Sequence, residues 1–314
     1  MKAYLLNEAG DVENLVLSDI EKPRIKVNEV LVETKAISIN PVDVKVRKAD
    51  EVLTLIMGTE ERPVIPGWDI SGIVVAVGEE VSEFEVGNKV FGMVNFPGQG
   101  KGYAEYVASP ASHLAIMPEK ATFEEAAATT LAALTALQVL KPRVNKGDRI
   151  LIHAGSGGVG HFAIQIAKVL GAHVISTSSA KNRDFIMSLG ADEHIYYREQ
   201  KFEEVLSDID FVLDGMGGEV LENSLKVVKD GGKIVSLPTH QFPEDLQARA
   251  DQRNVVLEFV LVQSNGDDMN TLKDMLEVNE LIPHVSKILP FEKMADAHTQ
   301  VESGRTVGKL VVTL

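Results

Sequence analysis

The spacing of hydrophobic positions differs between the first third of the chain and the rest. In the first third, short runs rich in β-branched residues are separated by Gly, Pro, Asn and Glu, as in residues 29–34, 70–77 and 89–94. Closely spaced runs with frequent turn residues predict the strands of a barrel or of a partly open barrel. We therefore expect a β-rich region before residue 118.

Beyond residue 118 the pattern becomes helical. Thr122, with acids at positions 124 and 125, predicts a capped helix start, and an Ala-rich stretch continues the helix to Leu140 before Pro142 interrupts it. From residue 149 onwards, strand and helix patterns alternate, which predicts a parallel sheet with helices on both faces.

The predicted elements of this second region follow from the spacing of its apolar residues, which differs between strands and helices. Strands are predicted at residues 149–154, 173–177, 194–196, 211–214, 233–237 and 308–313, and helices at residues 159–170, 181–189, 201–206, 218–228, 271–280 and 291–303. The apolar run 255–262 predicts one more strand, which is consistent with an inner strand or with an edge of the sheet.

A glycine pattern joins the first of these strands to the first helix. Its first glycine allows a tight turn, the second removes a side chain where a pyrophosphate approaches the backbone, and the third lets helix and strand pack closely. Free N–H groups at the helix N-terminus then face the phosphates. The predicted dinucleotide contacts are Gly155, Ser156, Gly157, Gly158, Val159 and Gly160. A glycine-rich turn without a ligand is the alternative.

The residues after the second predicted strand indicate which dinucleotide binds. An NAD site usually has Asp or Glu there, whereas this chain has Thr177, Ser178, Ser179 and Lys181 before its first acid, Asp184. Hydroxyl and ammonium groups suit a 2′-phosphate, which a carboxylate would repel. These residues favour NADP(H), although Lys181 and the nearby Arg183 can also be read as solvated residues at a helix start.

Composition excludes several other functions. The chain has 314 residues, 31 Lys and Arg against 46 Asp and Glu, a net charge of −15 and no cysteine. We therefore expect no nucleic acid or anionic membrane as a partner, no disulfide and no thiolate metal site. No signal peptide is expected, and the uncharged stretch 126–140 is too short and polar to span a bilayer, so we predict a soluble cytoplasmic protein.

Several strings spread along the chain resemble one family. They are Ser-Ile-Asn-Pro-Val-Asp at 38–43, Pro-Gly-Trp-Asp at 66–69, Gly-Tyr-Ala-Glu-Tyr at 102–106, the glycine turn at 153–160, Leu-Gly-Ala-Asp at 189–192 and Gly-Arg-Thr-Val-Gly-Lys at 304–309. Together they resemble the medium-chain dehydrogenase/reductase superfamily, and in particular its zinc-independent quinone oxidoreductase (enone reductase) branch.

This resemblance implies an α/β fold with two domains. A doubly wound Rossmann domain with a parallel sheet, residues 118–282, would bind NADP(H). A GroES-like β-barrel domain, residues 1–117 and 283–314, would be catalytic, with the active site in the cleft between them. Relatives are commonly homodimers through the sheet edge of the cofactor domain, and we predict the same here.

The resemblance also implies that no metal is used. Zinc-dependent relatives have a Cys ligand where this chain has Asn40, and a His ligand where it has Trp68. Catalytic zinc needs about three protein ligands, and Asp43 and Asp69 alone cannot define such a site. The predicted metal content is therefore none.

Four side chains are the predicted catalytic candidates, and each has a structural alternative. Asn40 is expected near the nicotinamide and substrate, or else as a turn residue before Pro41. Asp43 is expected to orient its neighbours, or only to cap a helix. Trp68 could wall the substrate pocket or pack in the barrel core, and Thr130 could face the nicotinamide or bond back to its own helix.

The resemblance implies four further cofactor contacts. Tyr197 would lie against the 2′-phosphate, although Tyr196 is adjacent and the register is uncertain by one. Leu237 would follow a parallel strand at the ligand-binding edge of the sheet, Val260 would meet the nicotinamide amide, and Lys309 would lie near the cofactor. An exposed tyrosine and a lysine at a strand start are the alternatives for Tyr197 and Lys309.

The predicted activity is hydride transfer from NADPH to a small-molecule quinone or α,β-unsaturated carbonyl (enone), without zinc. Such acceptors take hydride readily because negative charge delocalises onto oxygen, so positioning and hydrogen bonds suffice. A non-catalytic NADPH-binding protein, structural or regulatory, and a zinc-free carbonyl or enoyl-thioester reductase are the alternatives. The sequence does not identify the physiological acceptor.

Overall fold

The computed structural model describes all 314 residues and divides into two compact units. Unit 1 comprises Met1–Leu134 and Val262–Leu314, and unit 2 comprises Thr135–Leu261. This division falls at other residues than the domain bounds expected from the sequence, which stay a prediction. Each unit is described by itself below.

Unit 1 is built on a seven-stranded sheet with a separate two-stranded sheet. The order of the large sheet is β14-β15-β3-β4-β5-β7, with β6 also paired to β3, and only the β14–β15 pair is parallel. The strands are β1 Lys2–Leu6, β2 Leu15–Asp19, β3 Glu29–Ile39, β4 Asp69–Val77, β5 Lys89–Met93, β6 Tyr106–Pro110, β7 Leu114–Ile116, β14 Val285–Pro290 and β15 Lys309–Thr313. The path ends at β14 and β7 without joining them, as in a partly open barrel.

The long strand β3 organises this sheet. Its residues alternate between core and half-buried positions, and β4 pairs with it from Val30 to Ser38. Along its other edge, β6 pairs with the first half and β15 with the second half. The last residues of β3 therefore lie beside the first residues of β4 and β15. In this way the segment close to residue 310 lies beside residue 39.

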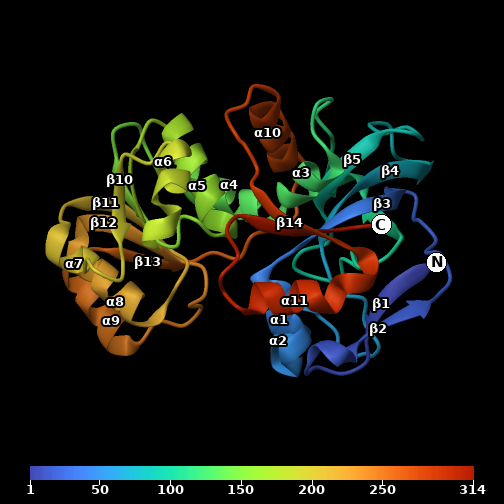
Figure 1. Ribbon diagram of the computed structural model, residues 1–314, viewed down its shortest axis with the longest axis horizontal. Helices are drawn as coiled ribbons and strands as arrows, with labels where there is room; N and C mark the ends of the chain where they lie inside the picture. Colours follow the sequence, from blue (N-terminus) through green and yellow to red (C-terminus); the bar gives the residue numbers. More distant parts are fainter. The chain divides into compact units, whose positions relative to one another are not determined.

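Short helices complete unit 1 (Figure 1). They are α1 Pro41–Lys48, α2 Asp50–Met57, α3 Phe123–Ala128, α10 Gly266–Glu277 and α11 Met294–Glu302, with single 3₁₀ turns at Val12–Asn14, Ala111–His113 and Phe291–Lys293. No element is predicted for residues 41–57, which form α1 and α2. Strand β14 is not predicted either, and the predicted start of α10 is five residues late, because the cap at Asn265, which accepts from the Asp268 N–H at 2.9 Å, was overlooked.

Unit 2 contains a six-stranded parallel sheet of order β10-β9-β8-β11-β12-β13. Figure 1 shows α5 and α6 on one face of this sheet and α7, α8 and α9 on the other. The strands are β8 Arg149–Ile152, β9 His173–Ser178, β10 Glu193–Tyr196, β11 Ile209–Asp214, β12 Val228–Ser236 and β13 Val256–Phe259, and the helices are α5 Gly158–Val169, α6 Arg183–Ser188, α7 Phe202–Val205, α8 Gly218–Val227 and α9 Glu244–Gln252, with a 3₁₀ turn at Ala180–Asn182. The predicted alternation is confirmed, and α9 is an addition to it.

The apolar runs of the strands form the two cores. In unit 2, Leu151, Ile175, Val212 and Ile234 come from four neighbouring strands and are fully buried. In unit 1 the corresponding cluster includes Val30, Ile70, Val90 and Val107. Burying a side chain of this size contributes about 1.5–3 kcal/mol, so each cluster holds its sheet and helices together.

The Ala-rich segment forms two helices rather than the one predicted. The helix is interrupted after α3 at Thr129 and Thr130, and α4 Leu131–Leu140 follows. The Thr129 hydroxyl donates to the Glu125 carbonyl and the Thr130 hydroxyl to the Ala127 carbonyl, both at 2.8 Å, and hydroxyls that bond back to the main chain in this way compete with the helical pattern. The predicted cap at Thr122 is confirmed, since its hydroxyl accepts from the Glu125 N–H.

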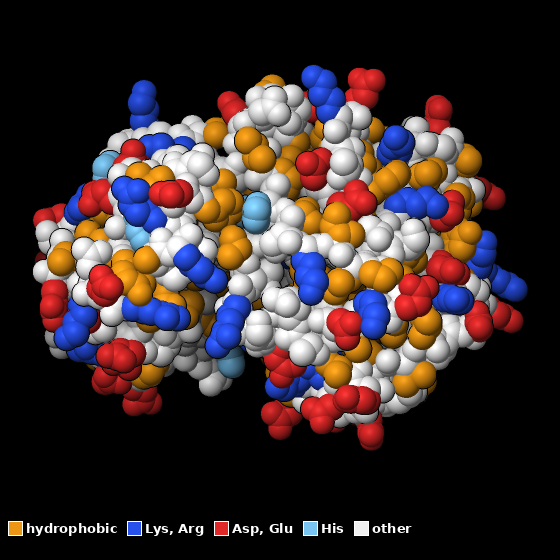
Figure 2. Space-filling model, in the orientation of Figure 1, with side chains coloured by type: hydrophobic (Ala, Val, Ile, Leu, Met, Phe, Trp, Pro, Cys, Tyr) orange, Lys and Arg blue, Asp and Glu red, His pale blue; other side chains and the backbone are white.

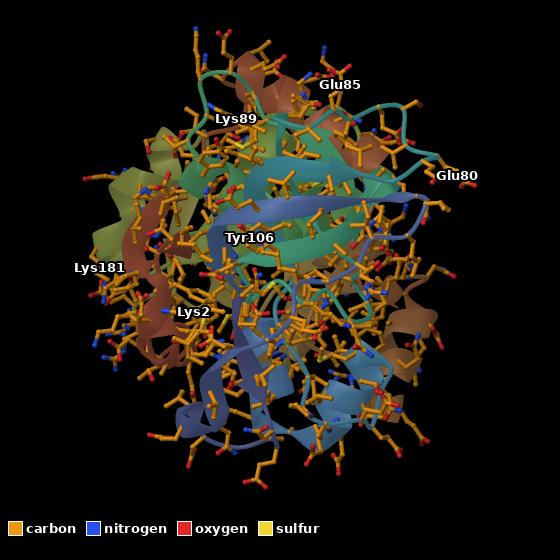
Figure 3. The ribbon with its side chains drawn as sticks, turned by 90° about the vertical axis from the view of Figure 1, so that its right-hand side faces the viewer. Lys2, Glu80, Glu85, Lys89, Tyr106 and Lys181 are labelled. Atoms are coloured by element: carbon orange, nitrogen blue, oxygen red, sulfur yellow. The ribbon has the colours of Figure 1, made fainter.

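The surface carries both signs of charge. On the face drawn in Figure 2, Asp and Glu side chains are spread with Lys and Arg among them, in keeping with the net charge of −15. Glu80 and Glu85, on the connection between β4 and β5, project outwards in Figure 3, as expected for a solvated acidic run. No helix of the chain is both long and apolar enough to cross a membrane.

Candidate functional site

The glycine turn of unit 2 connects β8 to α5. Gly157 is the N-cap residue of α5 and provides no side-chain cap, so the first N–H groups of the helix are left to other acceptors. Ala154, before the turn, adopts a φ of 53° in the left-handed region, which non-glycine residues rarely enter. Such strain is typical of functional loops that the surrounding structure holds in place.

The three glycines are required for different reasons. A Cβ on Gly155 would lie 1.8 Å from the Ser176 Oγ, and one on Gly160 would lie 2.3 Å from the Ala154 carbonyl oxygen. These two are therefore needed for the packing of the chain itself. A Cβ on Gly157 would meet only the Ala154 oxygen, at 3.2 Å. This contact is tight but requires only a small shift, so packing restricts Gly157 less than the other two glycines. The absence of a side chain there is what a pyrophosphate approaching the backbone requires.

The hydroxyls after β9 hold the turn in place. The Thr177 Oγ1 accepts from the Ala154 N–H at 3.3 Å and lies 3.2 Å from the His153 Nδ1. Burial lowers the pKa of His153 to about 4, so this ring is neutral, and its Nε2 lies 3.0 Å from the Ser224 Oγ. The Thr177 hydroxyl thus stabilises the turn. A contact between Thr177 and the cofactor stays a prediction.

Ser178 and Ser179 lie at the end of β9, where the ribose substituent is expected. The Ser178 hydroxyl donates to the Ser179 carbonyl at 3.0 Å and lies 2.9 Å from the Nε2 of His194 on β10. Burial and the nearby Arg183 guanidinium lower the pKa of His194. The sequence analysis did not single out His194, because the contact depends on the pairing of β9 with β10.

Lys181 and Arg183 are exposed cations of this region, and only Lys181 is unpaired. It forms no ion pair, and Figure 3 shows it at the outer surface, whereas Arg183 pairs with Asp184 at 3.3 Å. Between them, the Asn182 Nδ2 donates to the Ser156 Oγ at 2.8 Å and ties this segment to the glycine turn. Asn182 was missed, because an Asn in a polar loop has no distinctive pattern.

The other predicted cofactor residues follow the same edge of the sheet. Tyr196 is paired in register with Ser178, and Tyr197 follows it with its side chain 54% exposed. Leu237 follows β12 and Val260 follows β13, and both are half-buried. At the end of β11, the buried Asp214, also missed, accepts from the Gly217 N–H and the Ser236 hydroxyl. The geometry of this edge fits a dinucleotide.

Unit 1 contains a buried polar cluster at the end of β3 and at the beginning of β4 and β15. Leu310 pairs with Ile39 and Asp69 pairs with Ser38, so that register brings Lys309, Asn40 and Asp69 together. All three side chains are almost completely buried. The Asn40 Nδ2 donates to the Asp69 Oδ2 at 2.7 Å, and the Lys309 Nζ donates to the Asn40 Oδ1 and, at 3.2 Å, to the Ile39 carbonyl.

Asp43 forms a second layer of this cluster. Its Oδ2 accepts from the Asn40 N–H at 2.6 Å at the start of α1, as the capping alternative anticipated, and its Oδ1 has no hydrogen-bond partner. Burial, together with the Asp69 carboxylate, raises the pKa of Asp43 to about 8. Burial also raises the pKa of Asp69 and lowers that of Lys309.

Tyr103 and His298 adjoin Asp43. The Tyr103 hydroxyl lies 2.9 Å from the His298 Nε2, and burial with the Asp43 charge raises the pKa of Tyr103 well above its usual value. Burial lowers the pKa of His298 to about 3, so this ring is neutral. The sequence analysis identified neither residue, since positions 103 and 298 meet only through the fold.

Trp68 and Thr130 have the contacts of packed residues. Trp68 is fully buried, its indole N–H donates to the Gly98 carbonyl at 2.8 Å, and its ring packs edge-on against Phe96. Thr130 is also fully buried, with its hydroxyl bonded to the Ala127 carbonyl. These are the core alternatives noted above, and a role for either side chain at the substrate stays a prediction.

The cluster does not fit a zinc ion. Trp68 has only an N–H donor, and the Asn40 oxygen accepts from the Lys309 ammonium, so neither position offers a ligand atom. No group of three or more His, Cys, Asp or Glu side chains in the structure could hold a metal. The positive charge in this cluster is the ammonium group of Lys309.

Comparisons with known proteins identify the family. Residues 26–119 match the alcohol dehydrogenase GroES-like domain, and residues 189–312 match the zinc-binding dehydrogenase domain. The chain is 35% identical to the 2-methylene-furan-3-one reductase of Solanum lycopersicum, over 99% of this chain and 79% of that protein. It is 34% identical, with the same coverage, to the chloroplastic NADPH-dependent alkenal/one oxidoreductase of Arabidopsis thaliana.

A solved structure agrees with these relatives. The quinone oxidoreductase of Coxiella burnetii superposes with a TM-score of 0.92 at 35% identity, covering 100% of this chain and 99% of that one. Fold, site and similarity together define a two-domain α/β protein with a GroES-like and a Rossmann-like part, as predicted. The chain belongs to the medium-chain dehydrogenase/reductase superfamily, in its quinone oxidoreductase branch.

Proposed function

We propose that this protein transfers hydride from NADPH to a quinone or an α,β-unsaturated carbonyl compound, without zinc. The observation that carries the proposal is the similarity, over 99% of the chain, to a protein named as an NADPH-dependent alkenal/one oxidoreductase. The quinone oxidoreductase whose structure superposes on the whole chain supports the same class of acceptor.

The cofactor assignment is supported by residues of unit 2. The absence of a side chain at Gly157 and the uncapped first turn of α5 suit a pyrophosphate. Lys181, which has no carboxylate partner, and the Ser178 and Ser179 segment suit a 2′-phosphate, and no acid stands at the end of β9 to bind a free ribose hydroxyl. NADPH, when bound, supplies the hydride and leaves as NADP⁺.

The acceptor chemistry needs a polar environment rather than a metal. An enone takes hydride at its β-carbon, its C=C electrons move towards the carbonyl oxygen, and a proton completes the saturated ketone. A quinone takes one hydride and one proton to become a quinol. Donors aimed at the oxygen stabilise the charge that develops there. Asn40 has one N–H of its amide without an acceptor in the structure, and we assign it this donor role.

Steady-state turnover tests the proposal. The purified protein is mixed with NADPH or NADH and with a panel of quinones, enones, alkenals, simple ketones and an enoyl thioester, and loss of nicotinamide absorbance is followed. We expect turnover of conjugated acceptors, a preference for NADPH, and the same rates after chelator treatment. No turnover with any acceptor despite tight NADPH binding would support a non-catalytic protein instead, and rates abolished reversibly by the chelator would contradict the zinc-free chemistry.

Assembly and location complete the proposal. We propose a cytoplasmic homodimer in which β13, the edge strand of the unit 2 sheet, pairs with its copy. Val256 on this strand is 46% exposed, and an edge with apolar side chains is a favourable surface for pairing. Analytical ultracentrifugation should give a dimer that Val256→Lys weakens. A monomeric wild type, or a dimer unaffected by this change, would exclude the β13 interface.

A further inference from the structure

Lys309 holds an ammonium group inside unit 1 rather than at its surface. Its side chain is 2% exposed, and its Nζ has two hydrogen-bond acceptors, the Ile39 carbonyl and the Asn40 Oδ1. A buried ammonium is costly unless it is paired and hydrogen-bonded. The fold meets this cost mainly with the Asp69 carboxylate, which acts on Lys309 through space and opposes the effect of burial on its pKa.

The groups around the ammonium come from four elements. Lys309 begins β15, Asn40 and Ile39 lie at the end of β3, Asp69 begins β4, and Asp43 lies in the first turn of α1. Tyr103 faces Asp43 from the loop before β6. His298 contacts Tyr103 in turn, and the Arg47 guanidinium acts on Tyr103 through space. Lys309 is the only cation in contact with Asn40.

This arrangement fixes the orientation of the Asn40 amide. An ammonium can only donate, so the atom facing Lys309 must be the amide oxygen, and the amide nitrogen then faces the Asp69 carboxylate, which accepts. The Asp43 carboxyl group also accepts from the Asn40 main-chain N–H at 2.6 Å, which holds the main chain at this position. Any rotation of the amide would break its hydrogen bond to Lys309 or to Asp69. The orientation of its remaining N–H group is therefore fixed.

The hydrogen bond from Lys309 also polarises this amide. A cation bonded to the amide oxygen withdraws electron density from the nitrogen and strengthens the donor on the other side. Lys309 therefore increases the ability of Asn40 to stabilise an oxygen on which negative charge develops. If Lys309 instead contacted the cofactor, its loss would weaken NADPH binding first.

We propose that Lys309 is a positioning residue for hydride transfer, which fixes and polarises the Asn40 amide so that its free N–H binds the acceptor oxygen, with Asp69 as the partner that completes the fixed orientation. This inference rests on the proposed function. In place of a metal ion, the protein uses its own buried cation, and this cation acts through Asn40 rather than on the substrate directly.

A double-mutant cycle tests this proposal. Lys309→Met, Asn40→Ala and the double variant are compared with wild type for kcat, KM and the NADPH dissociation constant, the last by nicotinamide fluorescence without acceptor. Lys287→Met, which removes an exposed lysine of the neighbouring strand β14, is the matched control. We expect each single variant to lower kcat by at least about tenfold, while the NADPH dissociation constant stays within about twofold.

The double variant gives the decisive comparison. If Lys309 acts through Asn40, the double variant loses no more than the larger single loss, because residues that act as a unit are non-additive. Multiplied losses, or a weaker NADPH complex at unchanged kcat, would overturn the proposal. Lys309→Gln keeps an N–H donor without the charge and covers the case that Lys309→Met does not fold. An intermediate kcat supports the inference, and a wild-type kcat contradicts it.

The outcomes separate this inference from the proposed function. Turnover by wild type with normal kcat in Lys309→Met would leave the hydride-transfer function standing and remove Lys309 from it. Absence of turnover in wild type with every acceptor would remove both.

Discussion

Lys181 and Lys309 show how differently two lysines of one chain are used. Lys181 is assigned to the cofactor from the residues around it and Lys309 by resemblance, yet Lys181 is exposed without an ion pair, whereas Lys309 is enclosed with Asn40 and Asp69. An exposed ammonium is available to an incoming phosphate and is screened by salt. A buried one orients its neighbours. The sequence shows two similar residues, and only their surroundings separate the two roles.

The cofactor preference depends on Lys181. Changing Lys181→Glu places a carboxylate where a 2′-phosphate is expected, so repulsion replaces attraction for NADPH but not for NADH. We expect the NADPH dissociation constant to rise at least about tenfold, or about 1.4 kcal/mol, and that for NADH to stay within about twofold. Fluorescence titration measures both constants, with Lys146→Glu, another exposed unpaired lysine of unit 2, as control. An unchanged ratio of the two constants would reject the proposed 2′-phosphate site.

The buried Asp43 makes stability depend on pH. Because its pKa is raised from 3.8 to about 8, the folded chain holds a proton that the unfolded chain releases, so this group lowers stability progressively as pH rises from about 4 to about 8. Asp43→Asn removes the effect. The free energy of unfolding of this variant, relative to wild type, should therefore rise with pH across that range and level off above it.

Urea unfolding at a series of pH values measures this difference. Asp11→Asn, at an exposed position in unit 1, serves as the control and should show no such slope. A pH-independent difference between Asp43→Asn and wild type would mean that Asp43 is ionised in the folded protein at neutral pH.

At the scale of elements, the glycines of the turn differ in what requires them: packing of the chain or approach of the cofactor. A Cβ on Gly160 would overlap the Ala154 carbonyl, whereas one on Gly157 would need only a small shift of the Ala154 oxygen, and the Gly157 backbone is extended, with φ −82° and ψ −177°. Gly157→Ser should therefore keep the stability of unit 2, helped by a good N-cap residue, but weaken NADPH by at least about tenfold because the pyrophosphate loses its approach.

Gly160→Ala is the comparison for this variant. Its Cβ would overlap main-chain atoms, so we expect a lower melting temperature together with weaker binding. Thermal unfolding and NADPH titration of the two variants measure both effects. Unaltered NADPH affinity in Gly157→Ser would show that the turn does not receive the pyrophosphate.

The elements of unit 2 were more predictable than those of unit 1. Alternating strands and helices have distinct periods, and the pattern predicted β8, α5, β9 and β11 to within a few residues. The break between α3 and α4 was not predicted, because it depends on the hydroxyls of two threonines inside an Ala-rich segment. The edge position of β13 could not be read from its composition, since inner and edge strands are both apolar.

The candidate site was only partly predictable for a related reason. Asn40, Asp43 and Lys309 were identified by resemblance, but their mutual contacts depend on the register of β3 against β4 and β15. Tyr103 lies within the string at 102–106 and Asn182 next to Lys181, but neither position indicates the contact that its side chain makes, and His298 lies in no motif. Side chains that meet only through strand register or tertiary packing remain invisible to a reading along the chain.

At the scale of the whole molecule, the chain combines a dinucleotide-binding sheet with a second unit whose buried polar cluster contains a lysine. It has no cysteine and no group of side chains that could hold a metal, which suits acceptors that are already activated by conjugation. The positions at which zinc-dependent relatives have ligands, Asn40 and Trp68 here, lie in the part that matches the alcohol dehydrogenase GroES-like domain, residues 26–119. The shared architecture does not fix the chemistry, which the residues at these positions determine.

Transfer of deuterium tests the central claim most directly. NADPH carrying deuterium on the reactive face of its nicotinamide ring is incubated with the protein and an enone, and the product is examined by NMR and mass spectrometry. The account predicts one deuterium at the β-carbon of the saturated ketone and a solvent-derived hydrogen at the α-carbon, with or without a chelator. A product without deuterium from either face of the ring, or deuterium only at the carbonyl carbon, would contradict direct hydride transfer to a conjugated acceptor.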